Sequence, residues 1–396
     1  MVPRQFMLVA GEPSGDLLAA DLVRALREEI PVAEHDGAAG QPLHASLEPR
    51  FFGAGGPAMA KAGVELLFDL TRHAVVGLSD ALRKILTFRQ LLLRLVHAAE
   101  ERQPHAIICV DYSGFNLRLA RAIRKRVDRH KGPFRNCDPK IIQFVSPQVW
   151  ASRPGRAQKL ARNVDLLLAI FPFEKDWYAR RAPDLKVEFV GHPIIDRYAE
   201  FRPSKRSNEP LVVFLPGSRI GELHRHVPVM GQAATLMGKA RKTMVLPNAE
   251  LADVAKKLLP HGSDIHVQAG GLPEVLSGAD LAMAATGTVT MECAYFGVPT
   301  VALYKTSRMT YEIGKRIIKV KYLAMPNLLA DEPLFPEFVQ DAATPKNLAR
   351  AANDLLANDP RRNEIREKLP RVIKQLGPPG ASRRAAQAIS SLLLNR

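Results

Sequence analysis

Short, almost continuous apolar runs separated by helical stretches constrain the fold of this chain more than any other feature. They include 106–112 (AIICVDY) and 140–146 (KIIQFVS) in the first half. After the polar segment 200–210 (EFRPSKRSNEP) the rhythm restarts with 211–219 (LVVFLPGSR) and 279–288 (ADLAMAATGT). Such runs are typical of strands buried on both faces, as in parallel sheets covered by helices. We therefore expect an α/β chain with two doubly wound, Rossmann-like parallel-sheet domains that face a cleft.

The polar segment also sets the expected domain boundaries. We expect a first domain at 1–200, a linker at 201–210, a second domain at 211–375 and a helix over 376–396. A chain of 396 residues is long enough for two domains of ordinary size.

Ligand sites in parallel sheets lie beyond the carboxyl ends of the strands, so residues that directly follow a strand are the candidates. The first such loop lies in 6–26 (FMLVAGEPSGDLLAADLVRAL). Its glycines, Gly11 and Gly15, suit a turn that binds phosphate on backbone N–H groups. Its carboxylates, Glu12 and Asp16, repel phosphate, and the G-x-G-x-x-G spacing of a dinucleotide site is absent. The residues of this loop do not by themselves identify the ligand that it binds.

Asp111 ends the strand expected at 106–112. A lone carboxylate at that edge can act as a general base, because partial burial can raise its pKa toward neutrality. An aspartate that caps the following helix is an equally good interpretation.

Two segments of the second half are candidate phosphate sites. In 215–222 (LPGSRIGE), Gly217 and Ser218 let backbone N–H groups approach an anion, and Arg219 can bind phosphate oxygens in a bidentate manner. An ordinary strand–helix turn with an exposed arginine is the alternative.

The second segment is 285–299 (ATGTVTMECAYFGVP). Thr286, Gly287 and Thr288 open a helix whose N-terminus can receive a diphosphate. Glu292 follows one turn later and can accept both hydroxyls of a ribose. The alternative is a helix N-cap with a surface acid.

Two further features are ambiguous. The segment 145–156 (VSPQVWASRPGR) combines Trp150, which fits core packing, with Arg153 and Arg156. His192 fits a structural histidine at a domain boundary better than a catalytic one.

The net charge of +16 favours an acidic partner, which can be nucleic acid, a lipid surface or a phosphorylated substrate. The alternative for any one basic cluster is a solvated helix face. Basic residues gather in 118–162 and in 305–321. The second of these segments contains six Lys/Arg and a single glutamate. The segment 73–101 is apolar with interspersed basic residues, so it fits either a packed core helix or a helix lying in a membrane surface. Aromatic residues make up only 6%, and no helix-turn-helix pattern accompanies the basic stretches, which argues against a nucleic-acid partner.

Three widely spaced cysteines show neither zinc spacing nor a disulfide framework, which indicates a reducing compartment. No segment reaches the roughly 18 apolar residues that a membrane span needs. We therefore expect a cytoplasmic location.

Together, these motifs resemble lipid-A-disaccharide synthase, a glycosyltransferase family of lipid A assembly, over nearly the whole chain. The matching stretches are LVAGEPSGD (8–16), GAGGPAM (53–59), VVGLSDAL (75–82), VDYSGFN (110–116), FVSPQVWASR (144–153), FPFEKDWY (171–178), FVGHP (189–193), LPGSRIGE (215–222), ATGTVTMECA (285–294) and MPNLLA (325–330).

The resemblance implies a fold of the GT-B type, no metal or other cofactor, and peripheral attachment to the anionic inner-membrane surface. It implies transfer from UDP-2,3-diacylglucosamine to the 6-hydroxyl of 2,3-diacylglucosamine 1-phosphate, with inversion, giving the β-1,6 disaccharide 1-phosphate and UDP. The last helix, 376–396, is expected to return to the first domain. Whether it stays with its own chain or joins two copies in a homodimer is left open.

Carried over by residue, the resemblance makes Asp111 the base and places Arg219 at the UDP diphosphate. Glu292 matches the ribose-binding acid, and Asn327 matches a polar residue required at the donor site. The 11–16 loop, including Ser14, is expected to face sugar hydroxyls on the acceptor side. The membrane-facing residues are expected to be Val75, Val76, Leu78 and Leu82.

The chain departs from the family at Gly114, where relatives often carry a second aspartate, and in 33–49, which fits an inserted surface loop.

Two alternative functions are left open. One is another GT-B enzyme or a UDP-sugar epimerase with the same nucleotide half, and the other is a nucleic-acid-binding protein.

Overall fold

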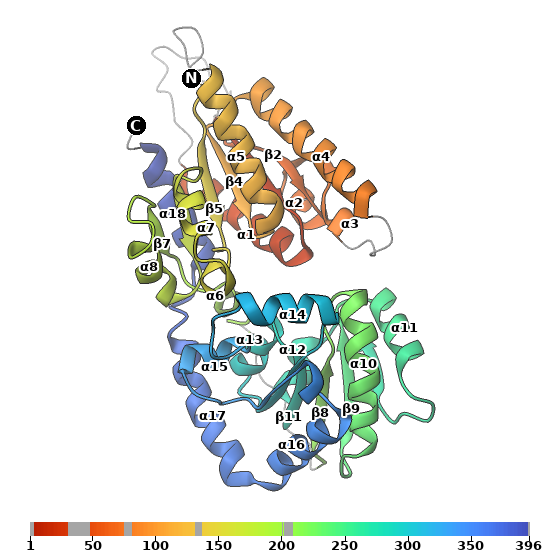
Figure 1. The fold of residues 1–396 in the computed structure, drawn as a ribbon. Helices are drawn as coiled ribbons and strands as arrows, with labels where there is room; N and C mark the ends of the chain where they lie inside the picture. The colour runs from red at the N-terminus through yellow and green to blue at the C-terminus, as the bar shows by residue number, and fades with distance from the viewer. Residues whose placement is uncertain are drawn as a thin grey trace, which may run out of the picture. The chain divides into compact units, whose positions relative to one another are not determined.

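The chain folds into two α/β units (Figure 1). The computed structural model describes residues 4–30, 48–74, 81–130, 137–199, 201 and 209–394. Unit 1 comprises Met1–Pro193 with Pro378–Arg396, and unit 2 comprises Ile194–Gly377. Each unit contains one parallel sheet covered by helices, which confirms the predicted fold class.

Unit 1 is built on a seven-stranded sheet in the order β3-β2-β1-β4-β5-β6-β7, and its paired strands run parallel. All five residues of β4 are buried, because helices cover both faces of the sheet. The strands are β1 (Gln5–Ala10), β2 (Arg50–Gly55), β3 (Glu65–Asp69), β4 (Ala106–Val110), β5 (Lys140–Phe144), β6 (Leu166–Ala169) and β7 (Val187–Phe189).

The last helix of the chain belongs to unit 1 and packs against the first, α1. Small and apolar side chains such as Ala385 and Ile389 are buried along it, so the two helices can approach closely. The helices of unit 1 are α1 (Pro13–Glu29), α2 (Pro57–Lys61), α3 (Thr71–Ala74), α4 (Ala81–Arg102), α5 (Ser113–His130), α6 (Val149–Ser152), α7 (Arg156–Ala161), α8 (Pro172–Ala179) and α18 (Ala381–Leu394).

Unit 2 is built on a six-stranded parallel sheet in the order β10-β9-β8-β11-β12-β13. Its strands are β8 (Leu211–Leu215), β9 (Arg241–Leu246), β10 (His266–Ala269), β11 (Leu281–Ala285), β12 (Thr300–Tyr304) and β13 (Glu337–Val339). Its helices are α9 (Ile194–Arg197), α10 (Ile220–Thr235), α11 (Ala249–Leu258), α12 (Leu272–Ser277), α13 (Thr288–Tyr295), α14 (Arg308–Ile317), α15 (Met325–Ala330), α16 (Pro345–Ala357) and α17 (Asp359–Lys374), with a 3-10 turn at Gln340–Ala342.

The division between the units falls at Pro193, whereas the sequence placed the domain boundary at the polar segment 201–210. The difference arises because α9 and the residues after it pack into unit 2. The ring of Tyr198 lies 5.3 Å from that of Tyr295 and 5.0 Å from that of Phe296, centroid to centroid.

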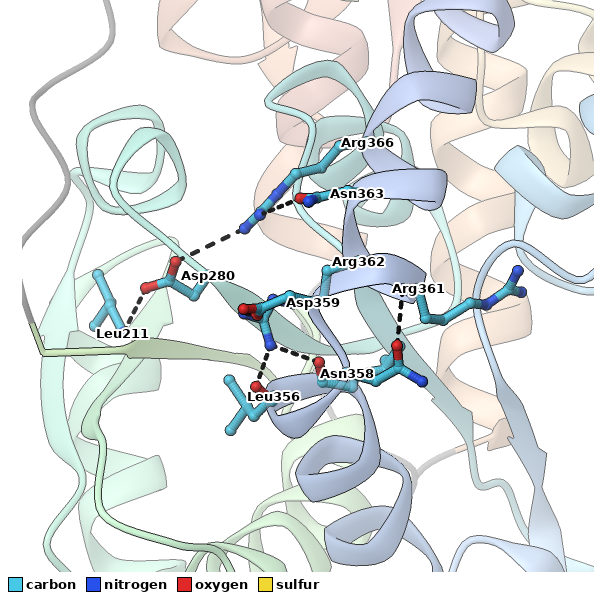
Figure 2. Close-up of polar contacts among 10 residues, drawn as sticks. Leu211, Asp280, Leu356, Asn358, Asp359, Arg361, Arg362, Asn363 and Arg366 are labelled. Atoms are coloured by element: carbon cyan, nitrogen blue, oxygen red, sulfur yellow. Dashed lines mark hydrogen bonds and ion pairs between the residues drawn. The ribbon is translucent and has the colours of Figure 1, made fainter.

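Polar contacts close the amino end of the second sheet, opposite to its carboxyl edge (Figure 2). Asp280, which precedes β11, accepts a 3.0 Å hydrogen bond from the backbone N–H of Leu211 at the start of β8. Its carboxylate also lies 3.7 Å from the Arg366 guanidinium on α17. Asn358 caps α17 by accepting the Arg361 N–H at 2.9 Å. This network attaches α17 to the sheet and leaves the opposite edge to the loops.

Candidate active site

The carboxyl ends of β1 and β4 bring the glycine loop and Asp111 together in unit 1. These strands pair in parallel, with Ala10 opposite Val110, so Gly11 and Asp111 leave the sheet side by side. A Cβ atom at Gly11 would lie 2.2 Å from the ring of Tyr112, and one at Gly15 would lie 3.7 Å from the Asp111 Cβ. The loop therefore packs against the Asp111 segment, and only glycine fits beneath Tyr112.

The backbone at this edge is strained. Asp111 and Tyr112 have φ values of 48° and 44°, and Val145, after β5, has a φ of 69°. Non-glycine residues rarely adopt these values, and a β-branched residue such as Val145 does so least readily. Strain of this kind persists where the surroundings over-determine it, and it clusters at functional sites.

Two buried side-chain amides hold Asp111 in this conformation. Asn116 Nδ2 donates to the Asp111 carbonyl at 2.8 Å, and Gln143 Nε2 donates to the same carbonyl at 3.2 Å. The Asp111 N–H donates to the Phe144 carbonyl at 2.8 Å. Neither amide side chain was singled out from the sequence, although a glutamine within the apolar strand 140–144 (KIIQF) is a signal that could have found Gln143. The backbone of the half-buried Asp111 is thus fixed, as a positioned proton acceptor requires.

Asp16 occupies a different place from the one expected. It is 4% exposed, and its carboxylate accepts the N–H groups of Gly56, Ala58 and Met59 at 2.7, 2.9 and 3.1 Å. These donors belong to the start of α2, so Asp16 caps that helix rather than facing a sugar. The predicted loop is also shorter than expected, because α1 begins at Pro13 and takes in Ser14 and Asp16. Glu12, the N-cap of this helix, is half-buried, and Ser14 in its first turn is exposed.

Trp150 is held by a buried glutamate that the sequence analysis did not identify. The indole Nε1 donates to Glu174 Oε1 at 3.0 Å, and the Phe171 N–H donates to Oε2 at 3.1 Å. Burial raises the pKa of Glu174 to about 7, against the opposing effect of these hydrogen bonds. The signal for Glu174 is its place in FPFE (171–174), three residues after the helix N-cap.

Three arginines gather near the carboxyl ends of β4 and β5. The pKa of Arg156 is lowered by burial and by the neighbouring charges of Arg153 and Arg118. In the part of the chain that the structure describes, none of the three forms an ion pair with a carboxylate. Like charges held close together in this way attract an anion.

His192 is buried, and its ring packs 5.3 Å from that of Phe171, in keeping with the structural interpretation.

In unit 2, a carboxylate already fills the loop after β8. The Ser218 N–H donates to Glu222 Oε2 at 3.0 Å, and Gly217 has a φ of 118°. A Cβ atom at Gly217 would lie 2.3 Å from Glu222 Oε2, so glycine is required there. Arg219, with a side chain 64% exposed, lies 3.7 Å from Glu222 Oε1. The loop is thus shaped to bind anionic oxygen, and Glu222 is a part of it that the sequence analysis missed.

His226 joins this loop to the end of β12. Its Nδ1 lies 2.7 Å from the Pro216 carbonyl, and its Nε2 accepts the Lys305 N–H at 3.1 Å. These partners require a neutral ring with its proton on Nδ1, and burial lowers the pKa of His226. His226 was not predicted from the sequence, because no motif singles it out.

The Thr286–Thr288 segment lies beside the β8 loop because β8 and β11 are paired neighbours. Gly287 is the N-cap of α13 with a φ of 139°, and no atom lies within 4 Å of where its Cβ would be. Gly287 and Thr288 are exposed and Thr286 is half-buried. The first turn of α13 is therefore accessible to a ligand.

Glu292 is 8% exposed and held by residues of the segment around α9. The Tyr198 hydroxyl donates to its Oε1 at 2.7 Å, and Arg197 Nη1 lies 3.3 Å from the same oxygen. The carboxylate is therefore fixed within unit 2. Sequence reasoning did not single out Tyr198 or Arg197.

Asn327 is fully buried, which does not fit direct contact with a donor. Its Nδ2 donates to the Phe335 carbonyl at 2.7 Å and to Glu337 Oε1 at 2.8 Å, and its Oδ1 accepts the Phe335 N–H at 2.8 Å. Asn327 thus attaches α15 to β13, and any effect on a ligand passes through that packing.

The residues predicted to face the membrane lie mostly outside the described residues. Val75, Val76 and Leu78 lie outside the described residues, as do 33–47 of the expected insertion. Leu82 lies in α4, but its side chain is outside the described part.

Comparison with known proteins decides the family. A family model described as "Lipid-A-disaccharide synthetase" matches residues 6–392. The chain belongs to this family. The lipid-A-disaccharide synthase of Geobacter sulfurreducens is 35% identical over 408 residues, covering 98% of this chain and 97% of the relative. The resemblance found in the motifs is thereby confirmed, and the chain is a glycosyltransferase.

Solved structures support the GT-B fold of this lipid-A-disaccharide synthase family member. A putative UDP-N-acetylglucosamine 2-epimerase from Listeria monocytogenes has a TM-score of 0.57 at 14% identity, covering 100% of this chain and 98% of that one. CalG4, a calicheamicin glycosyltransferase, has a TM-score of 0.56 at 14% identity, covering 100% and 99%. At these identities the likeness shows the fold alone. Among the described helices, none has the length and apolar character needed to cross a membrane.

Proposed function

We propose that the chain transfers 2,3-diacylglucosamine from UDP-2,3-diacylglucosamine to the 6-hydroxyl of 2,3-diacylglucosamine 1-phosphate. The products are the β-1,6-linked disaccharide 1-phosphate and UDP. Beyond the family, the observation that carries the proposal is the strained end of β4, where two buried amides fix the backbone of Asp111.

Asp111 is the general base in this proposal. As the acceptor 6-oxygen attacks the anomeric carbon of the donor, the hydroxyl proton passes to the Asp111 carboxylate. The bond from that carbon to the diphosphate oxygen breaks in the same displacement, so the configuration inverts and UDP leaves with the bonding electrons.

Unit 2 supplies the donor site. Arg219 and the first turn of α13 stabilise the negative charge that develops on the departing diphosphate. Gly217 and Ser218 provide the close backbone approach, and the fixed carboxylate of Glu292 accepts the ribose hydroxyls. Asn327 acts by positioning α15.

Unit 1 supplies the acceptor site. Glu12 and Ser14 lie at the start of α1, beside the Asp111 segment, where they can hydrogen-bond sugar hydroxyls. The cluster of Arg118, Arg153 and Arg156 carries positive charge near the same edge, which suits the acceptor 1-phosphate. We further propose that the chain works at the cytoplasmic face of the inner membrane, attached peripherally to its anionic surface.

Product analysis tests the proposed reaction. The purified chain is incubated with UDP-2,3-diacylglucosamine in detergent and EDTA, with and without 2,3-diacylglucosamine 1-phosphate. The proposal expects UDP release that depends on the acceptor, together with a disaccharide phosphate in the mass spectrum. Conversion of a bare UDP-sugar without a lipid acceptor would instead favour an epimerase.

A further inference from the structure

The helix α14 presents two large apolar side chains, Met309 and Ile313, that the described structure leaves exposed. None of its ten residues is buried. Met309 is 74% exposed and Ile313 is 50% exposed, and the two lie one turn apart on the same side of the helix. Ile317, one turn further along this side, is half-buried. Figure 1 shows α14 running across the edge of its unit rather than on a face of the sheet.

The flanks of this helix are basic. The helix and the two residues after it contain one acid, Glu312, and four cations: Arg308, Lys315, Arg316 and Lys319. In the described part of the chain, none of these four cations pairs with a carboxylate. An exposed apolar stripe flanked by unpaired cations is complementary to an anionic lipid surface.

The fold holds the segment in place at both ends. Gln340 Oε1 accepts the Thr306 N–H at 3.0 Å before the helix, and Glu337 accepts the N–H groups of Leu323 and Ala324 at 2.9 and 3.0 Å after it. Ser307 caps the helix by accepting the Thr310 N–H at 3.2 Å. Short helices usually draw their stability from packing of the apolar face, which α14 lacks.

We infer that α14 is a membrane-contacting element that inserts Met309 and Ile313 into the surface of an anionic bilayer. The inference rests on the proposed function in that both lipid substrates reside in such a bilayer. It adds a lipid-binding surface in unit 2 to the one predicted at 75–82 in unit 1.

Partition into vesicles tests this surface. Wild-type chain should bind phosphatidylcholine vesicles that contain phosphatidylglycerol more strongly than phosphatidylcholine alone. The partition coefficient of the double variant Met309→Ser/Ile313→Ser should be lower than that of wild type by about tenfold or more, because two apolar side chains no longer leave water on binding. Leu236→Ser, at a site on the same unit that is 55% exposed, should bind like wild type.

The charges are tested separately. Lys315→Gln/Lys319→Gln should weaken binding to anionic vesicles by about fivefold per charge and leave binding to phosphatidylcholine unchanged. Equal binding by wild type and both double variants would overturn the inference. So would a change in oligomeric state or in RNA binding without a change in vesicle binding, since the face would then have another occupant.

A local probe separates α14 from the rest of the chain. In a Cys137→Ser background, an environment-sensitive fluorophore on Met309→Cys should brighten with anionic vesicles, and one on Leu236→Cys should not. Equal responses at both sites would contradict the inference. Turnover in detergent micelles tests the proposed function independently: vesicle binding through α14 without disaccharide formation would overturn the function and leave the surface standing.

Discussion

The side-chain amide of Asn116 donates a 2.8 Å hydrogen bond to the main-chain carbonyl of Asp111. Asn116 is fully buried in the first turns of α5, whereas Asp111 ends β4 with a φ of 48°. A strained non-glycine residue costs on the order of 1–3 kcal/mol, which surrounding contacts must offset. The position of the proposed base therefore depends on the amide of a fully buried side chain.

Asn116→Ala should lower kcat and leave KM for both substrates within about twofold, because it releases the backbone of the base without removing a binding group. The free energy of unfolding should fall by about 1–3 kcal/mol, since the Asp111 carbonyl loses its shortest hydrogen bond. Steady-state kinetics and denaturant unfolding measure both effects. The exposed amide variant Gln158→Ala is the control. A loss of stability with unchanged kcat would give Asn116 a purely structural role.

Arg219→Ala should weaken use of the donor, because a charge-assisted contact to the UDP diphosphate is lost. We expect kcat/KM for the donor to fall by about tenfold or more, while KM for the acceptor stays near its wild-type value. Arg241→Ala, at the opposite edge of the same sheet, should behave like wild type. Unchanged donor dependence and unchanged turnover would remove Arg219 from the phosphate site.

Glu174 should make unit 1 less stable as the pH rises. Its folded-state pKa is about 7, above the ordinary value of 4.5, so its contribution is fully present below pH 4.5 and is lost as the pH rises through 7. The total loss is about 3 kcal/mol. Both tryptophans lie in unit 1, so tryptophan fluorescence during denaturant unfolding reports on this unit. Glu174→Gln should flatten the pH dependence, whereas the exposed Glu28→Gln should preserve it.

His226 should make the β8–β12 connection sensitive to acid. Burial lowers its folded-state pKa, so the stability it contributes is present above the ordinary value of 6.5 and is lost as the pH falls below it. Protonation of Nε2 removes the acceptor of the Lys305 N–H. Hydrogen exchange at Lys305, corrected for intrinsic rates, should therefore accelerate on acidification in wild type, and His226→Gln should show no such change. A pH-independent wild-type rate would contradict this assignment.

Local patterns predict the strands well, because a parallel strand buried on both faces must be apolar along its length. The run AIICV becomes β4, with all five residues buried. The glycine at the turn after β8 has a similarly local reason, since a Cβ atom at Gly217 would collide with Glu222, five residues later. The requirement for Gly11 is not local, because the ring that a Cβ atom would meet belongs to Tyr112 at the end of another strand.

The polar contacts that shape the site depend on residues far apart in the chain, and no local pattern reveals them. The three amides that commit Asp16 to α2 belong to residues 56–59. The Tyr198 hydroxyl that fixes Glu292 comes from a helical segment that the sequence assigned to the other domain. Asn327 was predicted at the donor site, but its side chain is fully buried and hydrogen-bonded to Phe335 and Glu337, which follow it in the chain.

The turnover of Asp111→Asn shows whether the Asp111 carboxylate takes the acceptor proton. UDP release is measured with saturating donor and acceptor in detergent and EDTA, beside wild type and the exposed carboxylate variant Asp21→Asn. Asp111→Asn should keep its fold and its affinity for UDP, but its turnover should be roughly 10²-fold or more lower, the scale of a lost general base. Near-normal turnover by Asp111→Asn would contradict this role and would assign the proton to another group.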